Sequence, residues 1–376
     1  MARSAHAYVR GNTLKFYEWL GAIPKHSLPE GPPIWICGDC HVGNLGPVAD
    51  SEGHVEIEIR DLDQTVIGNP AHDLIRLGLS LATAARGSDL PGTTTAHIIE
   101  HMLTGYEKAL MAPHRTPKLK KGEVRPIDAI LKRALKRRWR HLAEERIEDV
   151  RPAIPLGRRF WALAPEERPA IEKLFASPEA CALILNLHSD SEGAEVRVLD
   201  AAYWMKGCSS LGRLRFAVLL GVGRHSKQRY SLIDIKEAVA GAAPSTRRIN
   251  RNEDFAVRVA TGARALSPFL GERMLAGRLL RRPVVVRELT PQDLKLEIDR
   301  LTCEDAVVAA EYLAGVVGKA HARQMDASVR KRWHAELLRN RSKNLDAPGW
   351  MWKAVVELVA SHEAAYLEHC RRYALA

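Results

Sequence analysis

The chain has 376 residues, which predicts one large or two medium-sized domains with a sizeable core. Hydrophobic residues make up 46% and charged residues 27%, as is typical of a soluble globular protein, and no apolar run approaches the roughly 18 residues that span a bilayer. The net charge of +11 favours anionic partners such as nucleotides, phosphorylated metabolites or nucleic acid. Six scattered cysteines and an N-terminus without the apolar core of a signal peptide predict a cytoplasmic location and no membrane partner.

The first half of the chain combines helical patterns with two short strands. Val55–Ile59 alternates apolar and polar residues, as a half-buried strand does, and Pro70 stands where the next helix would begin. A Pro/Gly-rich link over 24–33 separates the first helix from the first strand. The predicted helices are Gly11–Leu20, Leu74–Arg86, 94–112 and 126–148, and the predicted strands are Ile34–Cys37 and Val55–Ile59.

The pattern changes near residue 183, where apolar runs are joined by glycine-bearing turns. Strands are predicted at Val196–Leu199, Leu214–Leu220, Tyr230–Ile235 and Val284–Arg287, with a helix over 251–265 and helices again from about 304. The predicted class is α+β, with three regions: a helical region over 1–182, a β-rich region over 183–290 and closing helices over 291–376.

The most informative stretch lies near the N-terminus, where Asn44 follows Asp39 after four residues and two further aspartates, Asp61 and Asp63, come soon after. This is the spacing of a kinase phosphotransfer centre. Asp39 would accept a hydroxyl proton, whereas Asn44 and Asp61, helped by Asp63, would hold magnesium. Asp73, near a helix start, would accept backbone N–H groups from the Asp39 loop.

Each of these residues is also a common turn former or helix cap, and that is the alternative for any one of them. Their occurrence in this order on a strand–turn–strand–turn–helix pattern favours a catalytic site. His41 is expected to hold the catalytic loop by packing or hydrogen bonding.

A second motif lies in the β-rich region, where Gly207 to Gly212, with Ser209 and Ser210 between them, connects two strand-like runs. Such a loop lets backbone N–H groups approach phosphates, although most glycine loops between strands are plain hairpins. Lys236, on a later strand, is the candidate for pairing with nucleotide phosphates, and Glu253 or Asp254 is the candidate carboxylate that would orient it. For Arg258 and Arg264, a solvated helix face is expected rather than a phosphate contact.

Two other segments have the composition of a binding site. Cys37 and Cys40 have the spacing of a metal or redox pair, but there is no second cysteine pair, and His41, His54 and His72 are the nearby candidate ligands for zinc. The basic helix over 128–141 carries one aromatic, Trp139, so stacking recognition of nucleic acid is unsupported. Its default interpretation is a solvated amphipathic helix, and the alternative is that it grips an anionic substrate.

These motifs resemble the protein-kinase-like superfamily, especially the aminoglycoside phosphotransferases, whose catalytic loop reads His-Gly-Asp-x-His-x-x-Asn. Gly38–Asn44 and Asp61 to Leu74 match that spacing, with Cys37 in place of the first histidine. Over most of its length the chain also resembles an uncharacterised bacterial family, domain of unknown function 2252. The matching features are Ser4, Arg10-Gly11, Gly38–His41, Asp61–Asp63, Gly207–Gly212, Lys236–Ala238, Val286–Leu289 and Lys319–Arg323.

The resemblance implies a two-lobed, protein-kinase-like fold with a mostly helical lobe and a smaller antiparallel β-rich lobe. The catalytic loop precedes the glycine loop and Lys236, the reverse of the usual kinase order, so the implied fold is circularly permuted. The helix from Glu304 to Arg323 would pack where it normally leads into the catalytic loop. Adenine would lie near the backbone of Glu288 and Leu289. Two departures from the pattern are the incomplete glycine signature and Thr261, where a glutamate is expected.

The resulting functional hypothesis is an ATP- and magnesium-dependent phosphotransferase that acts on a hydroxyl of a small-molecule substrate, for which an anionic compound is one candidate. One alternative is a pseudokinase that binds nucleotide and regulates a partner. Another is an enzyme that transfers AMP instead of a phosphoryl group.

Overall fold

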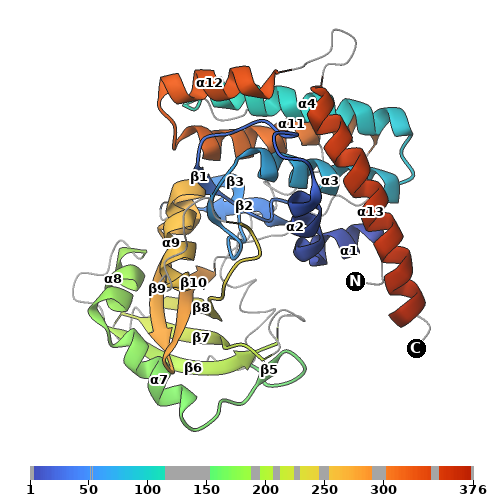
Figure 1. The fold of residues 1–376 in the computed structure, drawn as a ribbon. Coiled ribbons are helices and arrows are strands. Elements are labelled where there is room, and N and C mark those ends of the chain that lie inside the picture. The colour runs from blue at the N-terminus through green and yellow to red at the C-terminus, as the bar shows by residue number, and fades with distance from the viewer. Residues whose placement is uncertain are drawn as a thin grey trace.

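A computed structural model describes residues 4–50, 52, 54–114, 153–187, 195–205, 212–223, 229–244, 254–289, 302–339 and 347–373. These residues form an α+β fold, which confirms the predicted class. A helix-rich part, here called the helical part, lies above a six-stranded sheet and its helices, here called the sheet part (Figure 1). In the described residues, no helix combines the length and the apolar character needed to cross a bilayer.

The sheet part is built on one antiparallel sheet with strand order β5-β6-β7-β8-β10-β9. Lys236 on β8 lies opposite Arg215 on β7 and Val285 on β10, so three neighbouring strands bring these positions together. The strands are β5 (Phe160–Trp161), β6 (Val196–Trp204), β7 (Arg215–Val222), β8 (Arg229–Glu237), β9 (Met274–Leu279) and β10 (Arg282–Leu289).

Two helices, α7 (Glu167–Phe175) and α8 (Pro178–Asn186), cover one face of this sheet. Their buried residues Ile171, Phe175 and Ile184 form one cluster with strand residues such as Phe216 and Ile233. The structure therefore groups 153–182 with the sheet, whereas the predicted boundary places these residues in the first helical region. Proline breaks at the start of this segment hid its two short amphipathic helices in the sequence.

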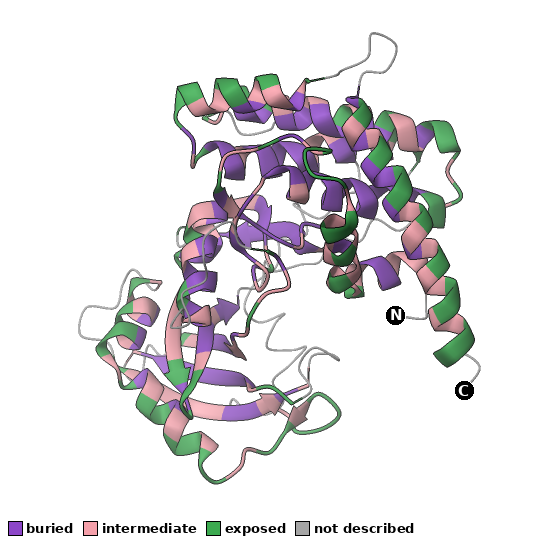
Figure 2. Cartoon of the chain, in the orientation of Figure 1, coloured by how far each residue is buried: buried purple, intermediate pink, exposed green. Residues whose placement is uncertain are grey.

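The helical part is centred on two long helices, α4 (Gly92–Met111) and α11 (Cys303–Ala322), which pack closely against each other. Glycines make the close approach possible, because a Cβ built on Gly105 would lie 1.9 Å from the carbonyl oxygen of Glu311, and one on Gly318 would lie 2.7 Å from that of Tyr106. Around this pair lie α1 (Ala5–Gly11), α2 (Thr13–Ala22), α3 (Ala71–Gly87), α12 (Ala327–Leu337) and α13 (Gly349–Tyr373). Figure 2 shows that α3 and α11 are the most deeply buried of these helices.

The first predicted helix, Gly11–Leu20, is found as α2, which begins at Thr13, and α1 before it was not predicted. Asn12 ends α1 and begins α2, and its side-chain oxygen accepts a hydrogen bond from the Lys15 backbone N–H at 3.2 Å. Asparagine favours such a cap, which is why α2 begins after Asn12 and not at Gly11. The predicted strands and the helices 94–112, 251–265 and Glu304–Arg323 are confirmed within a few residues. The basic helix predicted over 126–148 lies outside the described residues.

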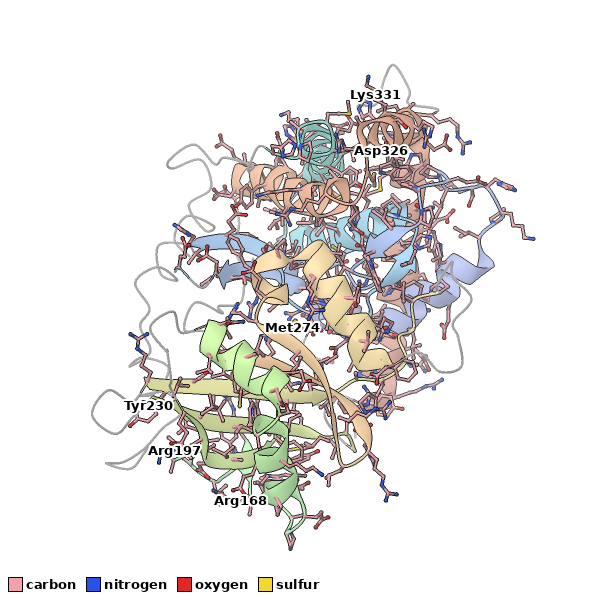
Figure 3. The ribbon with its side chains drawn as sticks, turned by 90° about the vertical axis from the view of Figure 1, so that its left-hand side faces the viewer. Arg168, Arg197, Tyr230, Met274, Asp326 and Lys331 are labelled. Carbon is pink, nitrogen blue, oxygen red and sulfur yellow. The ribbon has the colours of Figure 1, made fainter. Side chains whose placement is uncertain are left out.

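Two small antiparallel sheets and helix α9 (Phe255–Leu266) connect the two parts (Figure 1). The small sheets pair β1 (Ile34–Ile36) with β4 (Val66–Gly68), and β2 (Leu45–Ala49) with β3 (Val55–Ile59). A short 3-10 helix, η1 (Val42–Asn44), precedes β2, and a four-residue helix, α10 (Pro268–Gly271), follows α9. Figure 3 places Met274, at the start of β9, at the junction between the two parts.

Candidate functional site

The turn that carries Asp39 is fixed by its glycine and by a buried carboxylate. Gly38 has a φ of +75°, and a Cβ there would lie 2.2 Å from the carbonyl oxygen of Gln64, so only glycine fits. The Cys37 and Gly38 backbone N–H groups donate to the two carboxylate oxygens of Asp73, at 2.7 and 2.9 Å. Asp73 is 1% exposed, so both hydrogen bonds are sheltered from water.

A buried polar chain continues from Asp73 into the helical core. His321 Nε2 lies 3.2 Å from Asp73 Oδ2, and its Nδ1 lies 3.0 Å from the Tyr106 hydroxyl. The Trp333 indole N–H donates to that hydroxyl at 3.0 Å. These contacts link α3, α4, α11 and α12 to the turn, so the packing of the helical part determines where the turn lies.

Both oxygens of the Asp39 carboxylate are bound by neighbouring side chains. Arg76 Nε donates to Oδ1 at 2.9 Å, and the Thr13 hydroxyl donates to Oδ2 at 2.8 Å. Arg76 is fully buried and also donates to the carbonyl of Val9, which connects α1 and α2 to the turn. The Arg76 and Thr13 contacts fix the direction of the Asp39 carboxylate, and its side chain keeps 14% exposure to solvent, although Asp39 is not among the described residues that line the pocket between the two parts.

His41 lies beside Asp39, with its Nε2 3.9 Å from Asp39 Oδ2. Burial lowers the pKa of His41 to about 4, so the ring is neutral at physiological pH. A neutral ring can pack against the loop without placing a second buried positive charge next to Arg76. This position suits a supporting role for His41 in the loop.

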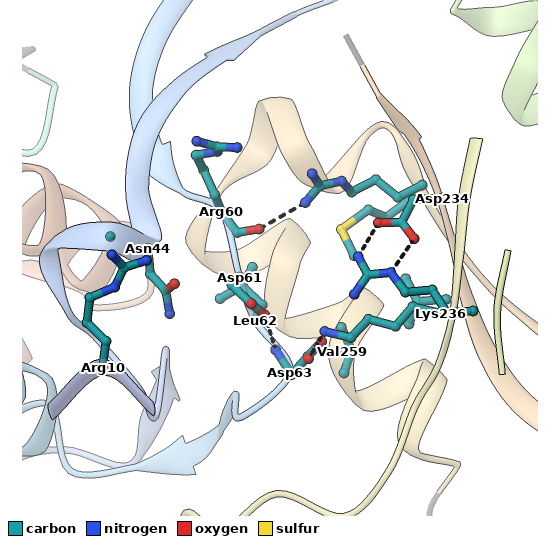
Figure 4. A pocket seen from close by; sticks show the side chains of 14 residues that line it. Arg10, Asn44, Arg60, Asp61, Leu62, Asp63, Asp234, Lys236 and Val259 are labelled. Atoms are coloured by element: carbon teal, nitrogen blue, oxygen red, sulfur yellow. Dashed lines mark hydrogen bonds and ion pairs between the residues drawn. The ribbon is translucent and has the colours of Figure 1, made fainter. Parts of the chain in front are cut away.

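Asn44 and Asp61 lie close together at the pocket, because Asn44 precedes β2 and Asp61 follows its paired strand β3 (Figure 4). The Asn44 amide donates through Nδ2 to the Asp39 carbonyl at 2.9 Å, which leaves its oxygen turned toward Asp61. The Lys236 ammonium lowers the pKa of Asp61 to about 2, so this carboxylate is ionised. The Asn44 amide and the Asp61 carboxylate, which lie at the neighbouring ends of β2 and β3, therefore line the same pocket.

Lys236 reaches from β8 across to the segment after β3, where its ammonium forms an ion pair with the Asp63 carboxylate. Burial opposes the charge on Lys236, but Asp61 and Asp63 together raise its pKa. Burial, with the nearby Asp61 charge, raises the pKa of Asp63. Lys236 therefore stays cationic beside two carboxylates that lie more than 170 residues away in the chain.

These groups line a pocket of about 290 Å³ between the helical part and the sheet part. Five of its lining side chains are cationic and three are acidic, so the pocket has a net positive charge that favours an anionic ligand. Its helical wall contains Arg10, Gly43 and Asn44, its floor is Arg60–Asp63 with Val259, and its sheet wall contains Arg215, Asp234, Lys236, Met274, Val285 and Arg287.

Hydrogen bonds from three arginines hold the sheet wall and the floor of the pocket in place. Arg215 forms a two-point ion pair with Asp234, at 3.1 and 2.6 Å. Arg287 donates to the Arg60 carbonyl at 3.0 Å, and buried Arg258 of α9 donates to the Asp63 carbonyl at 2.9 Å. The expectation of a solvated position for Arg258 is therefore wrong, because its guanidinium binds backbone carbonyls that connect α9 to the floor of the pocket.

Several predicted site residues do not meet at this pocket. Glu288 accepts a hydrogen bond from the Ser231 hydroxyl at 2.6 Å, and its backbone N–H donates to the Arg273 carbonyl at 3.2 Å. Leu289 packs in an apolar cluster on the sheet, and Gly212 is exposed with a φ of +73°. None of these three is among the described residues that line the pocket, and Gly207, Ser209, Ser210 and Glu253 lie outside the described residues.

Asp254 is not the partner of Lys236. Its carboxylate caps α9 by accepting from the Ala256 N–H at 2.9 Å, and it pairs with Arg278 at 2.9 Å. Asp63 occupies the role expected of a carboxylate on the helix after the lysine. The segment between β3 and β4, which contains Asp63, lies next to Lys236, whereas the Asp254 carboxylate is already used at the start of α9.

The Cys37 and Cys40 thiols and the Asp73 carboxylate lie within 4.8 Å of one another and are buried. A hydrogen bond with Cys40, together with burial, raises the pKa of the Cys37 thiol well above its usual value. Because metals bind thiolates, and because Asp73 already accepts two N–H groups, this cluster is suited to packing under the loop and not to holding zinc. His54 and His72 are not part of it.

Sequence reasoning missed Arg76 and Thr13, which hold Asp39, and Arg10, which reaches the pocket. A signal for Arg76 was available, since it is a charged residue within an apolar helix and stands three residues after Asp73, on the same helix face. No local pattern pointed to Thr13, because its partner lies 26 residues away.

A family model described as "Uncharacterized protein conserved in bacteria (DUF2252)" matches residues 1–372. The chain belongs to this bacterial family. The DUF2252 match spans the helical part and the sheet part together, so the pocket between them lies inside one family unit. Neither the curated proteins nor the solved structures include a match to this chain.

Proposed function

We propose that this DUF2252 protein is an ATP- and magnesium-dependent phosphotransferase with a circularly permuted, two-lobed kinase-like fold. The helical part corresponds to the lobe with the catalytic loop, and the sheet part to the lobe that covers the nucleotide. One observation carries the proposal: Lys236 shares a single cationic pocket with Asn44 and Asp61, which lie in a distant segment of the chain.

The residues of the pocket fit a magnesium ion. Magnesium prefers oxygen ligands and is usually held by one or two carboxylates together with substrate phosphates. Asp61 offers an ionised carboxylate and Asn44 an amide oxygen that its own Nδ2 contact turns into the pocket. With the ion bound, these two residues would hold it, and it would neutralise charge on the phosphates.

The residues also fit a nucleotide phosphate chain. Lys236 is cationic, and its present partner, Asp63, is a carboxylate of 38% exposure that a phosphate can replace. The ion pair is partly exposed, so the phosphate of a ligand can approach Lys236 in the place of Asp63. The excess of positive charge around the pocket further favours a polyanion.

Asp39 is suited to accept the proton of an acceptor hydroxyl. A carboxylate has about four lone-pair sites, and Arg76 and Thr13 use two of them. These two contacts fix the direction of the carboxylate without covering it. The oxygen atoms that remain accessible can orient a hydroxyl group and receive its proton as the new bond to phosphorus forms.

The acceptor is proposed to be a small molecule, because the Gly38–Asn44 motif resembles that of small-molecule phosphotransferases. The proposal is tested by incubating the protein with γ-labelled ATP and magnesium. Steady release or transfer of the label supports a phosphotransferase, whereas binding without turnover indicates a pseudokinase. A product that carries AMP, detected by its mass, indicates nucleotidyl transfer.

The role of Asp39 is tested with Asp39→Asn. Asparagine keeps the size and one hydrogen-bond acceptor but cannot take the proton, so turnover should fall by about two to four orders of magnitude while nucleotide affinity stays nearly unchanged. Glu363→Gln, which removes a surface carboxylate paired with Arg86, is the control and should behave as the wild-type protein. Full turnover by Asp39→Asn would refute this role.

A further inference from the structure

Arg10 reaches the pocket from the end of α1 and rests on Gly43. A Cβ built on Gly43 would lie 2.8 Å from the Arg10 guanidinium carbon and 2.8 Å from each of two of its nitrogens. Any residue other than glycine at position 43 would therefore displace this side chain. Gly43 therefore leaves space for the Arg10 guanidinium directly beside Asn44, which is proposed to bind magnesium.

The Arg10 guanidinium forms no hydrogen bond or ion pair with another side chain or backbone group in the described part of the chain. This distinguishes it from other cations of the pocket, since Arg215 binds Asp234 and Lys236 binds Asp63. An arginine presents a planar fork of N–H donors that matches the oxygens of a phosphate. Arg10 therefore brings unused donors to the pocket.

The order of the side chains along the pocket indicates which phosphate of a nucleotide would lie next to Arg10. In Figure 4 the labelled side chains run from Arg10 through Asn44, Asp61 and Asp63 to Lys236. Kinase lysines contact the inner phosphates of the nucleotide. A phosphate chain that begins at Lys236 and continues past Asp61 thus places its outermost group near Asn44 and Arg10.

We propose that Arg10 binds the terminal phosphoryl group of the bound nucleoside triphosphate, on the side where the acceptor approaches. The inference rests on the proposed nucleotide site. Neighbouring contacts support the location, because Thr13 binds Asp39, and α1 and α2 thus bring Arg10 and the proposed base to the same loop. A guanidinium at this point would neutralise charge on the group that is transferred.

The test compares two nucleotides by calorimetric titration in the presence of magnesium: the non-hydrolysable triphosphate AMP-PNP and the diphosphate ADP. Arg10→Gln should weaken AMP-PNP binding by about tenfold or more, the effect of losing one charged hydrogen bond, and should leave ADP binding unchanged. Arg10→Lys, which keeps the charge, should recover part of the loss. The readout is binding, so the acceptor need not be known.

Arg371→Gln is the charge-matched control, because Arg371 is 82% exposed near the end of α13. Equal affinities of Arg10→Gln and the wild-type protein for AMP-PNP would overturn the inference. So would an equal loss for both nucleotides, provided that thermal unfolding shows an intact fold. If the wild-type protein bound neither nucleotide, the proposed function itself would fail, which is a distinguishable result.

Discussion

On the helical wall of the pocket, the contacts that hold the Gly38–Asn44 loop are buried, with Asp73 and Arg76 1% and 0% exposed. On the sheet wall, the Lys236 and Asp63 side chains keep 24% and 38% exposure. The first set binds backbone groups and a fixed carboxylate, whereas the second is an ion pair across an open space. The two walls therefore differ in how far they are formed before a ligand arrives.

The difference indicates a division of roles. A buried hydrogen-bonded network has one arrangement, since any unpaired member would be costly, and it suits groups that must be positioned before reaction. A partly exposed ion pair leaves Lys236 accessible from the pocket, which suits the proposed exchange of Asp63 for a phosphate. The following variants test this comparison, beginning with the largest expected effect.

Asp73→Asn should damage the helical wall most. An amide can accept only through its single oxygen, so one of the N–H groups of Cys37 and Gly38 would face an N–H₂ donor in a buried site. We expect a loss of about 3–5 kcal/mol in the free energy of unfolding, measured by denaturant titration. Glu363→Gln, at an exposed pair, should change it by less than about 0.5 kcal/mol. A loss as small as that of the control would show that the network does not hold the loop.

Lys236→Met should impair the sheet wall through ligand binding. Methionine keeps an unbranched apolar chain but loses the ammonium, so affinity for Mg-AMP-PNP should fall by about 10–100-fold. The matched control is Lys353→Met, at a lysine of 73% exposure on α13. Unchanged affinity in Lys236→Met would remove the lysine from the proposed site.

Because His41 supports the loop of the helical wall and is neutral there, the free energy of unfolding should depend on pH. Its pKa is about 4 in the folded protein and about 6.5 in an unfolded chain, so the unfolded state binds the proton more tightly. Stability from this group is present above pH 6.5 and is lost as the pH falls toward 4. Unfolding of wild-type protein and His41→Asn, compared from pH 7 to 4.5, should show about 2 kcal/mol less acid destabilisation in the variant. Parallel curves would contradict a buried neutral ring.

Asp63→Asn should have the smallest effect on stability. Because the Lys236–Asp63 pair is partly exposed, its loss should lower the free energy of unfolding by less than about 1 kcal/mol. Thermal unfolding of the variant measures this. A decrease comparable to that of Asp73→Asn would mean that the two walls are equally preformed, and the comparison would fail.

Much of the local structure was predictable because it depends on neighbours in sequence. The alternation of Val55–Ile59 and the apolar pattern of α3 and α11 identify elements whose buried faces are regular. The turn at Gly38 and the helix start before Asp73 follow from residue types with strong local preferences. Helix α1 was missed, because a helix of seven residues is too short to show a clear periodic pattern.

The partners of the site residues were less predictable, since they depend on how distant segments meet. Nothing near Lys236 in the sequence indicates Asp63, which lies 173 residues away. The expected partner, Asp254, is instead used as a helix cap. Glu288 and Leu289, the residues predicted to lie near adenine, have hydrogen-bonding and apolar partners that depend on strand order, and neither is among the described residues that line the pocket.

The central claim is that Asn44, Asp61 and Lys236 form one magnesium–nucleotide site. The most direct measurement is the affinity for AMP-PNP, by calorimetry, with magnesium and with chelator, in the wild-type protein and in Asp61→Asn. We predict binding that strengthens by about tenfold or more with magnesium in the wild-type protein, and no such gain in Asp61→Asn. No binding, or the same magnesium dependence in both proteins, would contradict the claim.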